Sequence, residues 1–308
     1  MRHILITLSL LAVATTLVGC ETWSTDSEYG HAVFSDDGAG VAAVFMTYDA
    51  KDKVTHTAKK NFATQLLMKE TTSSVKPSEL TDLMPGRVVD LFYMRSEGYL
   101  ILGRQTDEVE RPDGSLESDI YYDHVTMDGT ITSLGGGTFL TMLSCDGGTS
   151  RSAVSRPIRV IPSPDGSVLA RFNAETSCDA RTQTVTFLDA QDLSVIDGPY
   201  TVPDVAQVQS GIGAMWATLD IGWTAGGKFA AAYWGSGDTF ASLKGVLYKA
   251  GLAPQQNVTM STGCFYPPTT SSEVRSDGSA VSIDEATGAV LLSSGANAPG
   301  AQGVFGCN

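Results

Sequence analysis

Positive charge is scarce in this sequence. The 308 residues include 20 Lys and Arg against 34 Asp and Glu, which gives a formal net charge of −14. Proteins that bind nucleic acid draw much of their affinity from basic side chains on phosphates, so this balance disfavours a nucleic-acid partner. Hydrophobic residues make up 42% of the chain and charged residues 18%. That composition excludes a disordered chain and is sufficient for a sizeable folded core.

Familiar signatures of catalysis are also missing. The sequence has no Gly-x-Ser-x-Gly elbow and no His-Glu-x-x-His motif. It has no Cys-x-x-Cys pair and its histidines are scattered, so we expect neither a metal site nor a cofactor. A hydrolase with two opposed carboxylates stays open as an alternative, because 34 acidic residues hide any such pair.

Long hydrophobic runs are absent except near the start of the chain. The uncharged stretch 4–19 covers 16 residues, which is shorter than the roughly 20 residues that a membrane-spanning helix needs. Arg2 precedes it, and it ends in the small residue Gly19. Charge, short apolar segment and small residues in this order predict a secretory signal peptide.

This segment ends in Leu17-Val18-Gly19-Cys20, which resembles the lipobox of bacterial lipoproteins. The resemblance implies that Cys20 is acylated, that the peptide is cut before it, and that the new amino terminus is acylated too. An ordinary signal peptide with a chance cysteine is the alternative. Two or three acyl chains hold a protein stably on a membrane. Glu21 follows the cysteine, where an Asp often retains such proteins at the inner membrane, so we expect the outer membrane and leave its face open.

The chain therefore divides into three expected parts. Residues 1–19 are the signal peptide, residues 20–30 are the lipidated cysteine and a polar tether, and residues 31–308 form the globular part. Ten flexible residues span about 17 Å on average, so the tether predicts a domain close to the membrane.

Four cysteines remain once Cys20 is set aside. An even number in an exported chain predicts disulfides, with three possible connectivities. Pairing of sequence neighbours is one of them, and buried free thiols are the alternative. The four residues are Cys145, Cys178, Cys264 and Cys307.

A hairpin unit recurs along the chain. Each copy has a short apolar strand, a turn rich in Ser, Asp and Gly, and a second, more apolar strand. The turns close at Gly38, Gly98, Gly166, Gly227 and Gly278. Asp-Gly and Gly-Gly adopt the positive φ angles of tight hairpins, and an apolar second strand indicates burial on both faces. Further hairpins are expected around 121–134 and 184–196, and residues 78–84 suggest one or two helical turns.

The segment Ser163-Pro-Asp-Gly-Ser-Val-Leu-Ala170 resembles the Ser-x-Asp-Gly turn of WD40-like and TolB-type propeller repeats. This resemblance implies an all-β fold, a β-propeller of five to seven blades. The Trp-Asp dipeptide of true WD40 repeats is absent. A β-sandwich or a pair of β domains is the alternative.

Aromatic residues gather in the fourth hairpin unit and are the candidate binding residues. They can stack on sugars or anchor a protein partner, and packing between neighbouring blades explains them as well. These residues are Trp216, Trp223, Tyr233 and Trp234. With no catalytic signature, we expect a lipid-anchored, non-catalytic binding or scaffold module with an envelope protein partner. The alternative is a hydrolase that acts on envelope glycan or peptide.

Overall fold

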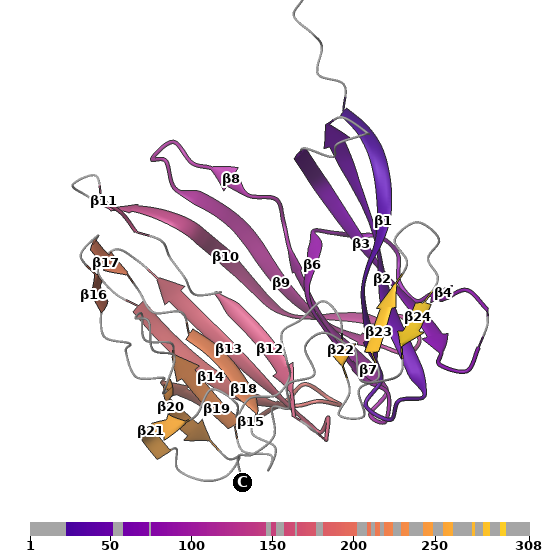
Figure 1. Cartoon of the computed structure of the whole chain (residues 1–308). Coiled ribbons are helices and arrows are strands. Elements are labelled where there is room, and N and C mark those ends of the chain that lie inside the picture. The colour runs from indigo at the N-terminus through magenta and orange to yellow at the C-terminus, as the bar shows by residue number, and fades with distance from the viewer. Residues whose placement is uncertain are drawn as a thin grey trace, which may run out of the picture.

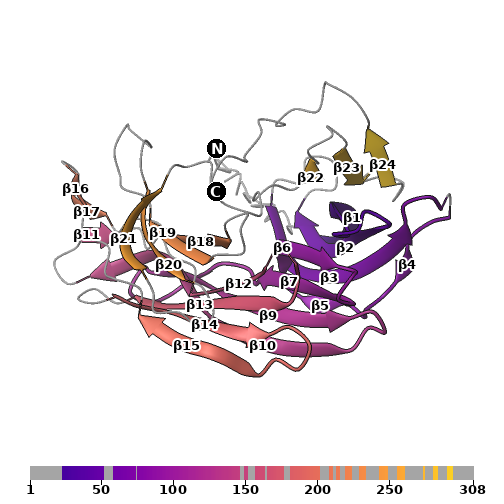
Figure 2. The same ribbon diagram turned by 90° about the horizontal axis from the view of Figure 1, so that it is seen from below.

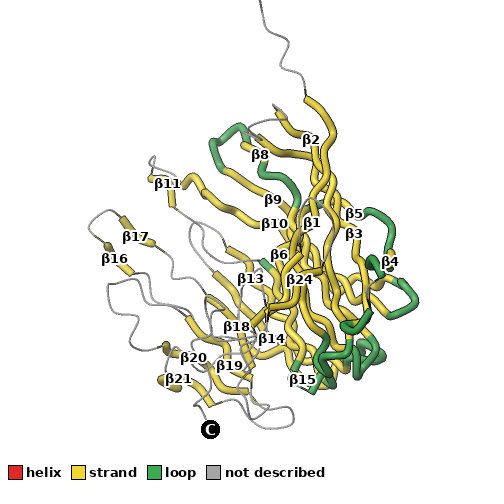
Figure 3. Tube along the Cα trace, turned by 45° about the vertical axis from the view of Figure 1, so that its right-hand side comes forward, coloured by secondary structure: helices red, strands yellow, loops and turns green. Residues whose placement is uncertain are grey.

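The computed structural model shows an all-β fold in the residues that it describes, the first of which is Trp23 (Figure 1). The described residues are 23–51, 58–73, 75–145, 149–151, 157–163, 165–176, 181–201, 208–210, 213–215, 219–223, 229–233, 243–248, 255–260, 273–274, 280–283 and 290–293. Over these ranges the backbone forms strands and turns and no helix, as Figure 3 shows. The described part of the chain accordingly contains no helix long and apolar enough to cross a membrane.

Three antiparallel sheets occupy residues 23–201. Sheet 1 contains β1 (Trp23–Phe34), β2 (Gly40–Lys51), β3 (Ala58–Glu70), β4 (Ser78–Glu79) and β5 (Met84–Pro85). Sheet 2 contains β6 (Arg87–Met94), β7 (Tyr99–Gln105), β8 (Val109–Glu110), β9 (Leu116–Thr126), β10 (Ile131–Cys145) and β11 (Thr149–Arg151). Sheet 3 contains β12 (Ile158–Pro162), β13 (Val168–Thr176), β14 (Arg181–Asp189) and β15 (Val195–Thr201).

Two further sheets and a small ribbon follow along the chain. The ribbon pairs β16 (Val208–Ser210) with β17 (Gly213–Met215). Sheet 4 contains β18 (Leu219–Trp223), β19 (Phe229–Tyr233), β20 (Leu243–Tyr248) and β21 (Gln255–Met260). Sheet 5 contains β22 (Glu273–Val274), β23 (Ala280–Ile283) and β24 (Val290–Ser293). In all five numbered sheets the long strands pair in the order in which they occur in the sequence.

The sheets follow one another around a common centre (Figure 2). In that view β6, β12 and β18 lie on the inner side and β10 and β15 on the outer side. The first strands contact one another in chain order, β1 with β6, β6 with β12, and β12 with β18. β1 also contacts β22 and β23, so the first sheet lies beside the last one.

Apolar side chains fill the spaces between successive sheets. In β7, Leu100 and Leu102 pack in the cluster shared with sheet 1, and Tyr99 and Ile101 pack in the cluster shared with sheet 3. All four side chains are at most 1% exposed. Side chains of a strand alternate between the two faces, so a central strand covered on both faces must be apolar throughout. This confirms, for β7, the prediction that the second strand of the hairpin unit is buried on both faces.

The five predicted hairpins are confirmed as β1–β2, β6–β7, β12–β13, β18–β19 and β22–β23. The two additional hairpins correspond to β9–β10 and β14–β15. The prediction of helical turns over 78–84 was wrong. Part of this segment pairs with β3, as β4 and β5, because the edge of sheet 1 offers backbone hydrogen-bonding groups that outweigh a weak local helix preference.

Residues 23–30, expected in the tether, belong to β1. Trp23 pairs with Lys51, and the ladder with β2 continues to Phe34. Their polar composition reflects partial exposure: residues 23–28 alternate between exposed and half-buried positions, and residues 29–31 are half-buried. Pairing with β2 satisfies the backbone, so a strand forms without an apolar sequence.

Candidate functional site

Three polar side chains belong to the first strands of sheets 1, 2 and 3, which contact one another in this order. They are His31 of β1, Asp90 of β6 and Arg159 of β12. Arg159 Nε lies 3.5 Å from Asp90 Oδ2, and the two side chains are only 5% and 8% exposed. The Asp90 charge also acts on the pKa of His31. With Tyr122 of β9, these residues are called the inner cluster below.

Backbone irregularities direct two of these side chains. His31 has a φ of 44° and lies in a bulge between Gly30 and Ala32, where the β1–β2 register shifts. A second register shift lies between Val88 and Asp90 in the β6–β7 ladder. Bulges re-aim side chains, and a non-glycine residue at positive φ is held there by its surroundings. Both distortions therefore occur in the cluster and suggest a function for it.

Tyr122 reaches Asp90 across a glycine. Asp90 pairs with Gly103 and Gly103 pairs with Tyr122 in the three neighbouring strands. The Tyr122 hydroxyl donates a hydrogen bond to Asp90 Oδ2. A Cβ at position 103 would lie 2.9 Å from Tyr122 Cε1 and 3.2 Å from Asp90 Cβ. The missing side chain of Gly103 thus creates the space in which the phenol ring meets the carboxylate.

The electrostatics of the inner cluster combine one fixed cation, one carboxylate and a weakened base. Burial lowers the pKa of His31 below its ordinary 6.5, and the Asp90 charge opposes this effect. The His31 imidazole is therefore neutral at pH 7 and can accept a proton. Arg159 remains charged and brings several hydrogen-bond donors. Together these groups can exchange protons and bind hydroxyl groups of a ligand.

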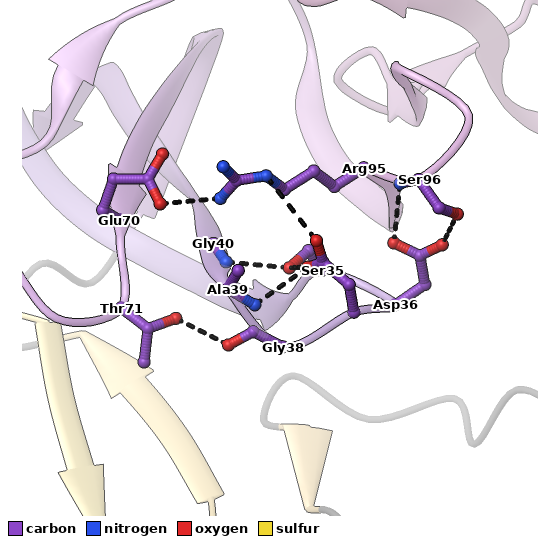
Figure 4. A network of polar contacts seen from close by, with 10 residues as sticks. Ser35, Asp36, Gly38, Ala39, Gly40, Glu70, Thr71, Arg95 and Ser96 are labelled. Atoms are coloured by element: carbon purple, nitrogen blue, oxygen red, sulfur yellow. Dashed lines mark hydrogen bonds and ion pairs between the residues drawn. The ribbon is translucent and has the colours of Figure 1, made fainter.

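A second polar network lies at the hairpin turns (Figure 4). Ser35 Oγ donates to Asp37 Oδ1 at 2.5 Å and accepts from the Gly40 amide at 2.8 Å. In sheet 3, Ser163 Oγ donates to Asp165 Oδ1 at 2.6 Å and accepts from the Val168 amide at 3.0 Å. The Ser-x-Asp-Gly turns thus have the same hydrogen bonds in two different sheets. The turns 35–38, 95–98 and 163–166 are together called the turn network below.

Hydrogen bonds also link one turn to the next. The Ser96 amide donates to Asp36 Oδ1 at 3.1 Å, and the Ser96 hydroxyl donates to the same carboxylate, as Figure 4 shows. Between sheets 2 and 3, the Tyr99 hydroxyl donates a hydrogen bond to the Gly166 carbonyl at 2.7 Å. The turn network therefore connects sheets 1, 2 and 3 and stabilises their packing.

The predicted cysteine sites lie largely outside the described residues. Cys20, Cys178, Cys264 and Cys307 fall in undescribed ranges, and only the backbone of Cys145 is described, at the end of β10. Acylation and disulfide pairing therefore stay predictions. Within the described ranges no group of three or more His, Cys, Asp and Glu is placed to hold a metal.

The predicted aromatic binding residues are only partly described. Trp223 pairs with Phe229 and Tyr233 pairs with Leu219, so they stand at opposite ends of the β18–β19 ladder. Trp216 and Trp234 lie outside the described residues. The strand register does not bring Trp223 and Tyr233 together.

The sequence analysis missed the inner cluster. A detectable signal was present, because Asp90 and Arg159 interrupt the apolar runs Val88–Met94 and Ile158–Pro162 of two first strands. Charged residues are almost never fully buried unless they are paired. A charge at the same place in successive repeat units was therefore the pattern to look for.

Comparisons with known proteins leave the family open. No protein-family model and no curated protein matches the chain. Among solved structures, Zg3597, a family 117 glycoside hydrolase of Zobellia galactanivorans, matches with a TM-score of 0.37 and 10% identity over 81% of this chain and 73% of its own. MPT-1, a GDP-Man-dependent mannosyltransferase of Leishmania mexicana, matches with a TM-score of 0.37 and 15% identity over 83% and 81%. MPT-4, a mannose phosphorylase of Leishmania mexicana, matches with a TM-score of 0.34 and 14% identity over 83% and 79%.

Proposed function

We propose that this chain is a lipid-anchored protein of the bacterial cell envelope, that its sheets form a β-propeller, and that it hydrolyses a neutral glycan at the inner cluster. One observation carries the proposal: Asp90 and Arg159, from the first strands of two successive sheets, lie 3.5 Å apart, and the Asp90 charge acts on His31 in the first strand of the sheet before them. Burying polar groups costs free energy that an apolar core would avoid. Such clusters are typical of functional sites.

The arrangement of sheets supports the propeller. Sheets 1 to 5 each follow the chain as an up-and-down meander. Their first strands contact one another in sequence, and β1 contacts β22 and β23 of the last sheet. In a propeller each blade begins on the inside, packs on two neighbours and closes a ring, whereas a sandwich packs two sheets on each other. Five blades agree with the five numbered sheets.

The chemistry of the inner cluster supports a polyhydroxylated ligand. A sugar hydroxyl both donates and accepts hydrogen bonds. Asp90 accepts, Arg159 donates, and Tyr122 and neutral His31 can do both. The formal charge of −14 repels anionic ligands at a distance. A neutral glycan therefore fits this site better than a phosphorylated or acidic one.

Hydrolysis at this site would use one group that exchanges protons and one that stabilises positive charge. The lowered pKa leaves His31 neutral, so it can take a proton from the water whose oxygen bonds to the anomeric carbon and give that proton to the leaving oxygen as the glycosidic bond breaks. Asp90 provides the negative charge that stabilises a developing oxocarbenium ion. Tyr122 and Arg159 orient the Asp90 carboxylate through the contacts described above.

The anchor is tested by mass spectrometry of protein extracted from membranes. The expected amino-terminal peptide begins at an acylated Cys20, and the variant Cys20→Ser should appear in the soluble fraction. Fractionation on a density gradient then tests the outer membrane against the inner membrane. An unmodified peptide that still contains residues 1–19 would contradict acylation.

The glycan proposal is tested with the purified, acylated protein in detergent. A panel of neutral polysaccharides is assayed for release of reducing ends, and bound oligosaccharides are measured by calorimetry. His31→Gln should lower hydrolysis at least tenfold with a small change in Tm, because His31 is only half-buried. Asp128→Asn, in the exposed β9–β10 turn, is the matched control and should change nothing. Equal rates of hydrolysis for His31→Gln and wild type would contradict the proposed role of His31.

A non-catalytic module with a protein partner is the second candidate. It is favoured by β15, the outer strand of sheet 3, where Val195 is 57% exposed and Ile196 is 46% exposed. An edge strand with exposed apolar residues can pair with a strand of another protein. Cross-linking in membranes with a photoreactive residue at Val195 tests this candidate, and no reproducible adduct would contradict it.

A further inference from the structure

One end of sheet 1 is formed by the terminal residues of three long strands. Trp23, which begins β1, pairs with Lys51, which ends β2, and Lys51 pairs with Ala58, which begins β3. Figures 1 and 3 show this end projecting beyond the other sheets. It is also the end at which β1 begins, three residues after Cys20. Trp23, Lys51, Ala58 and Lys60 are called the sheet 1 tip below.

The sheet 1 tip combines an exposed aromatic ring with lysine side chains. Trp23 is 37% exposed, although its ring is large and mostly apolar. Lys60 Nζ lies 3.9 Å from the centroid of the Trp23 ring, which is an attractive cation–π contact. Lys51 projects from the same face as Trp23, because directly paired residues of antiparallel strands point to the same side of a sheet. The ring therefore has two lysines beside it.

Positive charge is concentrated at this end of an acidic chain. Residues 51–60 include four lysines and one aspartate, whereas the whole chain has a net charge of −14. Lys59 points to the opposite face, where it forms an ion pair. On the face of the Trp23 ring, Asp49 accepts hydrogen bonds from Thr25 Oγ1 at 3.1 Å and from Asn61 Nδ2 at 2.7 Å. This aspartate is therefore held within the sheet, and the two lysines of the tip lie nearer to its end.

We propose that the sheet 1 tip lies against the bilayer, with the Trp23 ring among the lipid headgroups and with Lys51 and Lys60 beside lipid phosphates. Tryptophan is enriched at membrane–water boundaries because its ring is apolar and its N–H is polar. Lysine side chains extend along apolar surface and place their ammonium groups at the same level. This inference rests on the proposed acylation of Cys20, which would hold Trp23 within about 10 Å of the lipid, and not on the proposed hydrolysis.

The contact would fix how the domain is oriented on the membrane. Acyl chains alone hold one end of the chain and leave the sheets free to turn. Because the chain as a whole is acidic, lipid phosphates repel most of its surface, so the end that carries the lysines turns toward them. The acyl anchor keeps the tip at a high effective concentration near the lipid, so a weak contact is sufficient.

Quenching of tryptophan fluorescence tests the placement of Trp23. The acylated protein is inserted into vesicles of phosphatidylethanolamine and phosphatidylglycerol, with or without bromine on the acyl chains near the headgroups. Bromine quenches tryptophan only at short range, and the difference between wild type and Trp23→Phe isolates the Trp23 signal. Brominated vesicles should lower this signal at least twofold.

A second indole serves as the control for this measurement. The variant Trp23→Phe with Val195→Trp moves the exposed indole to β15, which lies far from the sheet 1 tip in Figure 1. Its added signal should be the same in both kinds of vesicle. Equal quenching at the two positions, or no quenching of Trp23, would overturn the proposal.

Charge reversal tests the two lysines. The double variant Lys51→Glu, Lys60→Glu should lower the quenching of Trp23 at least twofold at low ionic strength, where surface charges are little screened. Lys69→Glu is the matched control, since Lys69 belongs to the same strand as Lys60 but pairs with Val41 near its other end. An equal effect of Lys69→Glu would show that net charge acts instead of the tip. Should the double variant not fold, Lys51→Gln takes its place, and unchanged quenching then contradicts the role of the lysines.

Mass spectrometry of the same samples separates this inference from the proposed function. An acylated Cys20 with an unquenched Trp23 overturns the tip contact and leaves the anchor in place. If Cys20 carries no lipid, the anchor fails, and sedimentation of the chain with the same vesicles tests the tip alone. Binding that is lost in Lys51→Glu, Lys60→Glu would support the tip contact, and no binding would overturn it.

Discussion

The inner cluster and the turn network both use aspartates, but they satisfy them in opposite ways. In the turn network Asp165 accepts hydrogen bonds from Ser163 and Ser167, two residues away on either side. In the inner cluster Asp90 is held by Tyr122 from another strand and by Arg159 from another sheet. The Ser-to-Asp hydrogen bonds of each turn lie within one short segment, whereas the Asp90–Arg159 pair exists only when sheets 2 and 3 are assembled. Polar contacts between residues close in sequence stabilise each hairpin, whereas contacts between residues far apart in sequence depend on how the sheets pack.

The inner cluster and the turn network each contain an Asp–Arg pair, Asp90–Arg159 and Asp37–Arg95. The largest difference in unfolding free energy is expected when the aspartate of each pair is replaced by asparagine. Asp90→Asn leaves the buried Arg159 charge uncompensated and should cost about 3 kcal/mol of unfolding free energy. Asp37 lies 3.7 Å from Arg95, with exposed fractions of 41% and 32%. Asp37→Asn should therefore cost no more than about 1 kcal/mol. Chemical denaturation measures both values, and similar losses would erase the distinction between the two networks.

The next largest loss of unfolding free energy is expected for Gly103→Ala, which fills the space beside Tyr122. A methyl group there would overlap the Tyr122 ring, and overpacking of this kind costs about 1–3 kcal/mol. In a Tyr122→Leu background Gly103→Ala should cost clearly less, because the ring is gone. Equilibrium unfolding of the four proteins checks this. An unchanged cost in both backgrounds would show that the glycine has another role.

Removing the turn serines should have smaller and equal effects. Ser35→Ala and Ser163→Ala each remove one hydroxyl that donates to an aspartate and accepts from an amide. Each should cost about 1 kcal/mol, the net value of a typical hydrogen bond. Because the two turns lie in different sheets, the double variant should lose the sum of both values. A strongly non-additive result would mean that the turns act as one unit.

The smallest expected effect is on the pH dependence of stability, in which the two networks should act over different pH ranges. Burial lowers the pKa of His31 below 6.5, so the folded protein takes up this proton less readily than the unfolded chain, and stability falls as the pH drops below 6.5. The Ser163 hydroxyl lowers the pKa of Asp165 below 3.8, so its contribution is present above pH 3.8 and is lost below it. Tm is measured from pH 8 to pH 3, where His31→Gln should flatten the upper part of the curve and Asp165→Asn the lower part. The reverse assignment would contradict both pKa directions.

The parts of the fold that could be predicted are those fixed within a few residues. Ser, Asp and Gly at fixed spacing identified the hairpins because one turn contains all its own hydrogen-bond partners. The hairpins predicted around 121–134 and 184–196 correspond to β9–β10 and β14–β15. By contrast, residues 23–30 of β1 required knowledge of β2, since nothing in their polar sequence indicates a strand. Asp90 and Arg159 lie 69 residues apart, so their pairing depended on how sheets 2 and 3 pack.

β1 also has a consequence for where the protein can work. It begins at Trp23, only three residues after Cys20, a reach of about 10 Å. His31 follows eight residues later along the same strand, a rise of roughly 26 Å. With Cys20 acylated as proposed, the strand is a rigid spacer between the bilayer and the reacting groups. It limits their distance from the lipid surface to at most a few tens of ångströms, which keeps them within reach of polymers close to that surface.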